Sequence, residues 1–358
     1  MRNRNSILFA ILLLLIPLSL YAGSPQAETG PEVEYPESVV PGSILSIVIG
    51  DEPQDGGGEE RRTGFFAELL DKDGKPVTKG KSFEAEAAGT ESESRRSRFI
   101  LLGVPNTLDP GTYVLRLYRD HVDGRNAQGR YSDESGEDGA GENGEEPYLE
   151  DEIEVSARSF EEDVIPLRKS LTSLRRTPDP RKAEEAREIR SLYARFDPGA
   201  VYDMESWIVP VEYKYITSRF GDRRKYEYQD GATARAIHSG VDFAASTGTP
   251  VTACGGGVVK MAKDRIISGY TVVLEHLPGV YSIYFHLDSL DVERGERVDR
   301  GDILGTVGMT GLATGPHLHW EIRVQGVAVD PWVLTKKGLF ETIAEDKEQK
   351  KTPEEEGG

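Results

Sequence analysis

The sequence predicts a mainly β protein, in which a glycine-rich antiparallel β-sheet domain follows a β-sandwich and a short helical connector. Runs rich in β-branched and aromatic residues, such as "SILSIVIG" and "GYTVVLEH", recur between glycine, proline and aspartate turns. The short strands expected over residues 31–157 have the spacing of an immunoglobulin-like β-sandwich. Residues 207–335 show almost no helical periodicity, which favours a second all-β unit.

The N-terminal residues 1–22 are typical of a signal peptide. Arg2 and Arg4 precede an apolar core over residues 7–20, and small residues follow around Ala22. Because this core is short for a bilayer span, we expect cleavage near Ala22 and no transmembrane segment in the mature chain. The protein is therefore predicted to be exported, to the periplasm, the cell envelope or the exterior.

The chain of 358 residues carries a formal net charge of -19, which argues against a nucleic-acid partner. Much of the acidity lies in the segment 132–152, which is interpreted as a solvated, flexible loop. Weak calcium binding is the alternative, although the spacing matches no compact ligand loop. The single cysteine, Cys254, cannot form an intramolecular disulfide and is expected to pack as a small buried residue.

The N-terminal module, residues 31–157, shows no catalytic cluster, and we interpret it as a spacer, targeting or interaction module that could bind an envelope protein. The connector, residues 158–206, contains one predicted helix over 180–196. Asp179 is its expected N-cap and Pro180 suits its first turn. The tail, residues 341–358, is predicted to be disordered.

Five of the six histidines fall within residues 207–335. His317 and His319 lie on one face of an expected strand, and an extended "HSGVD" segment places His238 and Asp242 on one face as well. Such imidazoles could bind a metal, act as a base or merely pack. A catalytic zinc site needs three protein ligands and one water. His238, Asp242 and one histidine of the pair meet that count, which leaves the other histidine and His286 beside the water.

Several motifs together resemble the lysostaphin-type (LytM-like) zinc metallopeptidases that cleave cell-wall peptidoglycan. These are "ITSRFGDRR", "HSGVDFAA", "GYTVVLEH", "YSIYFHL", "VERGERVDRGDILGTVGMTG" and "TGPHLHWEIRV", which occur in the order of the family. The resemblance covers residues 207–335. It implies that His238, Asp242 and His319 bind Zn2+, that His286 and His317 form an unligated catalytic pair, and that His276 has a supporting role.

The resemblance implies an exported zinc metalloendopeptidase that hydrolyses the peptide cross-links of peptidoglycan. Two features depart from the family pattern: the loop before "TVVLEH" is short, and Leu277 follows His276 where glycine is common. Two alternatives remain open. One is a non-catalytic protein of the same fold that binds the cell wall or regulates an amidase. The other is an inert structural envelope protein.

Overall fold

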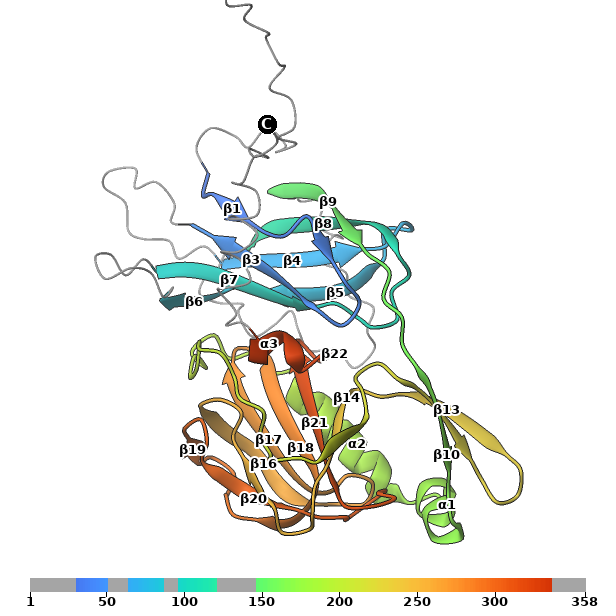
Figure 1. Cartoon of the computed structure of the whole chain (residues 1–358). Coiled ribbons are helices and arrows are strands. Elements are labelled where there is room, and N and C mark those ends of the chain that lie inside the picture. The colour runs from blue at the N-terminus through green and yellow to red at the C-terminus, as the bar shows by residue number, and fades with distance from the viewer. Residues whose placement is uncertain (1–29, 51–63, 87–95, 121–145, 337–358) are drawn as a thin grey trace, which may run out of the picture.

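The computed structural model describes residues 30–50, 64–86, 96–120 and 146–336, and these residues form a mainly β protein, as predicted (Figure 1). The predicted signal peptide and the predicted disordered tail lie outside the described residues. Among the described residues, no helix has the length and apolarity needed to cross a membrane. The prediction of an export signal is therefore not tested by the fold.

The N-terminal module is a sandwich of two β-sheets. One sheet has the order β1-β3-β7-β6 and the other β2-β9-β8-β4-β5. Alternating residues of the strands, such as Phe65, Ala67 and Leu69, point between the sheets and form a shared apolar core. The immunoglobulin-like character of this sandwich stays a prediction. The strands are β1 (Val33–Glu34), β2 (Ser38–Val39), β3 (Ile44–Ile49), β4 (Gly64–Leu70), β5 (Pro76–Lys81), β6 (Phe83–Glu86), β7 (Arg96–Gly103), β8 (Gly111–Asp120) and β9 (Leu149–Val155).

The acidic loop predicted over residues 132–152 extends too far. Residues 121–145 lie outside the described residues, whereas Leu149–Val155 form β9, which pairs with β8. In this strand the acidic side chains alternate with buried Leu149 and Ile153. This alternation of polar and apolar residues is the signal of a half-buried strand, and the high charge of the segment obscured it.

The connector contains more structure than the single helix predicted from the sequence. Strand β10 (Glu162–Pro166) and helix α1 (Lys169–Arg176) precede helix α2 (Pro180–Tyr193). The side chain of Asp179 accepts a hydrogen bond from the backbone N–H of Arg181 at 2.8 Å, so the expected N-cap is present. Helix α2 ends at Tyr193 rather than at residue 196.

The C-terminal sheet follows the order β11-β14-β21-β18-β17-β16-β19, and all of its strand pairs are antiparallel. Helix α2 lies against one face of this sheet (Figure 1). Its Leu192 and Tyr193 pack against Met261, Val273 and Tyr281. The elements are β11 (Tyr215–Ser218), β14 (Gly240–Ala244), β15 (Pro250–Thr252), β16 (Gly257–Arg265), β17 (Gly269–Leu277), β18 (Val280–Leu290), β19 (Arg297–Val298), β20 (Ile303–Val307), β21 (His317–Val324), β22 (Val327–Val329) and α3 (Trp332–Lys336).

Two contacts join the C-terminal domain to the segments that precede it. The hairpin of β12 (Arg223–Glu227) and β13 (Thr233–Ile237) gains β10 as a third, parallel strand. The sandwich contributes Phe99 and Leu101 to the same apolar cluster as Phe243 and Trp320 of the C-terminal sheet. The sandwich and the connector are thus packed onto the C-terminal domain.

Candidate metal centre

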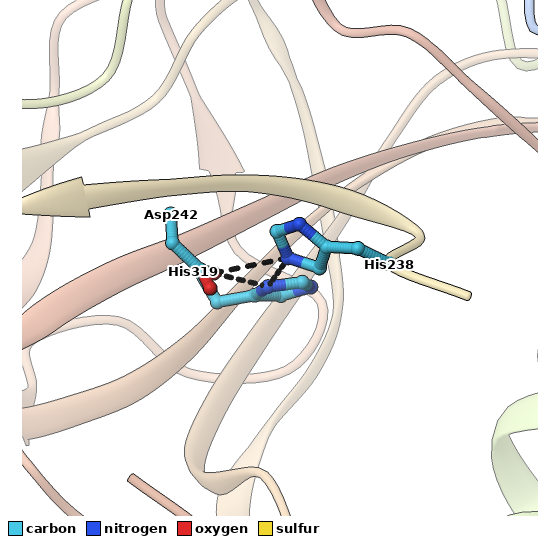
Figure 2. A group of neighbouring side chains, drawn as sticks. All are labelled: His238, Asp242 and His319. Atoms are coloured by element: carbon cyan, nitrogen blue, oxygen red, sulfur yellow. Dashed lines mark hydrogen bonds and ion pairs between the residues drawn. The ribbon is translucent and has the colours of Figure 1, made fainter. Parts of the chain in front are cut away.

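Three side chains of the C-terminal sheet converge at one point (Figure 2). Asp242 on β14 lies directly opposite His319 on β21 in the antiparallel ladder. Facing residues of such a pair project to the same side of the sheet, so their side chains meet. His238 directly follows β13, at the start of the connection to β14, and brings a third side chain to the same point. All three residues are buried.

These side chains lie close enough to one another to be ligands of a single metal ion. His238 Nε2 lies 3.1 Å from Asp242 Oδ1, and His319 Nδ1 lies 2.7 Å from the same oxygen. The two nitrogens are 2.9 Å apart. One ligand atom from each residue lies within 4.8 Å of the others, so the group could hold a metal ion. The structure brings together the three residues that the sequence predicted as ligands.

The hydrogen bonds of the outward ring nitrogens determine which nitrogen of each imidazole faces the centre. His238 Nδ1 donates to the backbone oxygen of Arg219 at 2.8 Å, and His319 Nε2 donates to Glu321 Oε1 at 3.0 Å. In the metal-free chain, a proton on His319 Nδ1 can be donated to Asp242 Oδ1 at 2.7 Å. Once this proton is lost, the lone pairs of His238 Nε2 and His319 Nδ1 lie 2.9 Å apart beside the same carboxylate oxygen. A cation can take the place of the proton, so this donor set fits a metal ion.

The pKa shifts reflect the mutual attraction of a carboxylate and two imidazoles at the centre. Burial raises the pKa of Asp242, but the attraction of His238 and His319 outweighs it and holds this pKa well below the usual value. Burial lowers the pKa of His319, whereas Asp242 and Glu321 together raise it to about 9. The same negative charge that attracts a proton to His319 attracts a divalent cation.

His286 and His317 lie next to the three converging residues, with their ring centroids 4.7 Å apart. His286 Nδ1 donates to the Thr310 oxygen at 2.7 Å, and His317 Nδ1 donates to the Gly315 oxygen at 2.8 Å. Nε2 of each ring is therefore the acceptor. His317 Nε2 lies 3.8 Å from Asp242 Oδ1, so this pair borders the centre.

Two properties of His286 mark it as a constrained residue. Burial, followed by the charges of His317 and His319, lowers its pKa to about 3, so the imidazole is neutral near pH 7. Its backbone has a φ of 63°, which is uncommon for residues other than glycine. Such strain persists where the surrounding structure enforces it and often occurs at functional sites.

His276 does not reach the centre. Its Nδ1 donates to the Gly256 oxygen at 2.6 Å, its Nε2 lies 2.7 Å from Ser282 Oγ, and its ring packs 4.2 Å from that of Trp207. Its role is therefore within the core. Cys254 is buried close by, and burial raises the pKa of its thiol to about 12, as expected for a packing residue.

The sequence interpretation missed two charged residues beside the centre. Glu321 binds His319, and a signal for it was available, because residues 317, 319 and 321 lie on one face of β21. Arg224 forms an ion pair with Asp242 Oδ2. No local pattern links an arginine 18 residues before Asp242 to that carboxylate.

Comparison with known proteins places residues 236–331 within the model of peptidase family M23. The peptidoglycan DD-endopeptidase ShyA of Vibrio cholerae is 38% identical over 149 residues, which cover 39% of this chain and 34% of that protein. The DD-carboxypeptidase/endopeptidase Mpg of Neisseria meningitidis is 38% identical over 124 residues, which cover 35% of this chain and 28% of that protein. The chain thus spans about a third of the length of these curated relatives.

A solved structure from Pseudomonas aeruginosa, assigned to peptidase M23, resembles a larger part of the chain. It is 26% identical, with a TM-score of 0.51, and the similarity covers 83% of this chain and 94% of that one. The likeness therefore extends beyond residues 236–331 into the preceding segments. The family match confirms the predicted resemblance over residues 236–331, and the wider boundary of 207–335 stays a prediction.

Proposed function

Since residues 236–331 match the model of peptidase family M23, we propose that this chain is an exported zinc metalloendopeptidase that hydrolyses peptide cross-links of peptidoglycan. The observation that carries the proposal is the convergence of His238 Nε2, Asp242 Oδ1 and His319 Nδ1, with two further imidazoles beside them. A packing role for the histidines would not require three ligand atoms to face one another.

His238, Asp242 and His319 would hold the ion. Two imidazoles and one carboxylate suit Zn2+ and leave its fourth position to water or substrate. When bound, zinc lowers the pKa of its water and polarises the scissile carbonyl. Glu321 and the Arg219 carbonyl fix the orientation of the two imidazole ligands through their outward nitrogens.

His286 and His317 would perform the proton transfers. No His-Glu-x-x-His motif occurs in the sequence, so the proton acceptor has to come from another residue. A neutral imidazole carries a lone pair on one ring nitrogen, which can accept a proton. In our proposal the Nε2 atoms of this pair orient and deprotonate the attacking water. One of them then stabilises the oxyanion of the tetrahedral intermediate or protonates the leaving amine.

The substrate assignment rests on the curated relatives, two of which are a peptidoglycan DD-endopeptidase and a DD-carboxypeptidase/endopeptidase. The signal-like residues 1–22 agree with export to the compartment where peptidoglycan lies. The region 207–335 carries 13 basic and 15 acidic residues, so strong electrostatic capture of the wall is not expected. Binding of an envelope protein by the N-terminal module stays a prediction.

The test is digestion of purified sacculi by the zinc-loaded mature chain, with mass spectrometry of the soluble products. We expect cross-linked peptides to be cut by the wild-type protein and to stay intact with Asp242→Ala. If wild-type protein binds zinc stoichiometrically but releases no peptide, the enzyme proposal fails and the non-catalytic binding protein is favoured. If it binds no metal and chelators leave its fold unchanged, the structural protein is favoured.

A further inference from the structure

The two carboxylate oxygens of Asp242 have different partners. Oδ1 lies 3.1 Å from His238 Nε2 and 2.7 Å from His319 Nδ1. Oδ2 points away from these atoms and forms an ion pair with the Arg224 guanidinium. The side chains of this pair are 14% and 9% exposed for Arg224 and Asp242. The Asp242 carboxylate is therefore fixed in one orientation, with a single oxygen directed at the two candidate histidine ligands.

The backbone of Arg224 is held from both sides. It lies on β12, upstream of the family match at residues 236–331. Within the three-stranded sheet, Asp163 of β10 lies opposite Arg224 on one side and Ala236 of β13 on the other. The N–H of Arg223 donates to the Glu161 oxygen at 2.7 Å. Connector residues thus fix the strand that carries the guanidinium.

The connector reaches a second ligand through Asp163. Ser218 Oγ lies 3.0 Å from Asp163 Oδ2, 3.1 Å from Asp222 Oδ2 and 3.1 Å from His238 Nδ1, so Asp163 and Asp222 share the single proton of this hydroxyl beside the ligand. One short strand is therefore linked to both Asp242 and His238. Strand β10 is accordingly part of the support of the centre, in addition to joining the two domains.

A carboxylate can bind a cation through one oxygen or through both. If both oxygens of Asp242 bound the ion, the second would take the position that a catalytic zinc site leaves to water. Charge-assisted hydrogen bonds from arginine are strong and directional. Without Arg224, a buried oxygen would lose its cationic partner and would be free to turn toward the ion.

We propose that Arg224 is a positioning residue, which limits Asp242 to one metal-facing oxygen and so keeps the fourth position open. This proposal rests on the metal-dependent function proposed above. It adds a residue outside the family match and assigns the connector a part in shaping the centre.

The test compares full-length wild-type, Arg224→Met and Arg224→Lys proteins after loading with cobalt(II), which reports coordination number through its visible absorption. Four-coordinate cobalt absorbs more strongly than five-coordinate cobalt. We expect Arg224→Met to bind one cobalt ion with clearly weakened absorption and to lose about 10–100-fold in sacculus hydrolysis. Arg224→Lys, which keeps the charge, should recover most of the absorption. Lys225→Met is the matched control, because Lys225 pairs with Glu227 on the same strand.

A folded Arg224→Met protein with the wild-type cobalt spectrum would overturn the proposal. Should that variant not fold, X-ray absorption spectroscopy of the zinc-loaded wild-type protein provides an independent test. Four ligand atoms around the zinc support the proposal, and five, with both oxygens of Asp242 bound, contradict it. A different result would contradict the proposed function itself, namely a wild-type chain that binds no metal.

Discussion

At the residue scale, each imidazole near the candidate centre uses one ring nitrogen for a protein acceptor and keeps the other for chemistry. In His238 the engaged atom is Nδ1 and in His319 it is Nε2. In His286 and His317 it is Nδ1 in both rings. Backbone carbonyls and one carboxylate thus set the tautomers, and so determine which nitrogens can bind an ion or accept a proton.

The first prediction concerns His286. Because its ring lies beside His317 and His319 without belonging to the ligand set, His286→Ala should bind zinc as the wild type does and lose about 10²–10⁴-fold in turnover. Zinc content and peptide release from sacculi are to be measured on the same preparation. Normal zinc content with wild-type turnover would contradict the proposed proton transfer.

The second prediction concerns the pH dependence of metal binding. The metal-free pKa of His319 is raised to about 9, so below that pH a metal ion has to displace a proton from this residue. The apparent dissociation constant for zinc should therefore rise about tenfold for each unit of pH lost between 8 and 6. Titration against a chromophoric chelator measures this slope. A constant affinity over that range would contradict the assignment of His319 as a ligand.

The third prediction concerns His276 and stability. Burial lowers its pKa from 6.5 to about 4, so the unfolded chain binds more protons than the folded chain between these two values. The free energy of unfolding should fall by about 3 kcal/mol as the pH drops through this window. In His276→Gln this part of the pH dependence should be absent. The free energy of unfolding of both proteins is measured by urea unfolding at several pH values. The same dependence on pH in both proteins would refute the prediction.

At the element scale, two glutamates attach helix α2 to the sheet, and they should contribute unequally to stability. Glu185 is buried, and its Oε2 accepts a hydrogen bond from the Ile266 N–H at 3.0 Å. Glu188 forms an ion pair with Lys263 in which both side chains are exposed. The buried carboxylate satisfies a backbone donor that has lost access to water, whereas the exposed pair is screened.

The fourth prediction compares these two glutamates. Glu185→Ala should lower the free energy of unfolding by about 1–3 kcal/mol, since it leaves the Ile266 N–H unpaired. Glu188→Ala, on the same helix, is the control and should cost about 0–1 kcal/mol. If urea unfolding gives the same loss of unfolding free energy for both variants, the buried hydrogen bond of Glu185 does not stabilise the contact of α2 with the sheet more than the exposed ion pair does.

The elements differ in how far the sequence predicts them. Alternation of apolar and polar residues predicts a strand such as β4, and Asp179 with Pro180 predicts the start of α2. Strand β10, with the sequence "EDVIP", has only five residues, and its pairing partner, β12, lies about 60 residues further along the chain. Helix α1 is also short, at eight residues. Such elements depend on tertiary pairing more than on local preference.

At the scale of the whole molecule, the sandwich and the C-terminal sheet share buried surface. Phe83, Phe99 and Leu101 of the sandwich belong to the same apolar cluster as Phe220 and Phe243. Arg158 of the connector forms an ion pair with Asp330 and donates to the Pro41 oxygen at 3.1 Å. Deletion of the first 206 residues would therefore expose apolar surface of the C-terminal domain as well as remove β10.

The fifth prediction concerns this deletion. The free energy of unfolding of residues 207–335 alone should be at least about 2 kcal/mol lower than that of the same domain within the full chain. This difference corresponds to the exposure of one large apolar side chain. Calorimetry of the two proteins measures the difference. An unchanged unfolding temperature would mean that the domains are energetically independent.

The candidate centre was predictable from the sequence only in part. The pairs His317/His319 and His238/Asp242 stand out because strand periodicity puts each pair on one face. Their convergence requires β14 and β21 to pair in the register that sets Asp242 against His319, and the spacing of the residues does not contain that register. Arg224 and Asp163 join the centre through a third sheet, which no local pattern indicates.

The central claim is that three side chains bind one divalent ion, and the most direct measurement is the zinc content of the purified full-length chain by plasma mass spectrometry. The account predicts one zinc ion per chain in the wild-type protein and almost none in Asp242→Ala at the same zinc concentration. A wild-type chain without zinc, or an Asp242→Ala chain that retains it fully, would contradict the account.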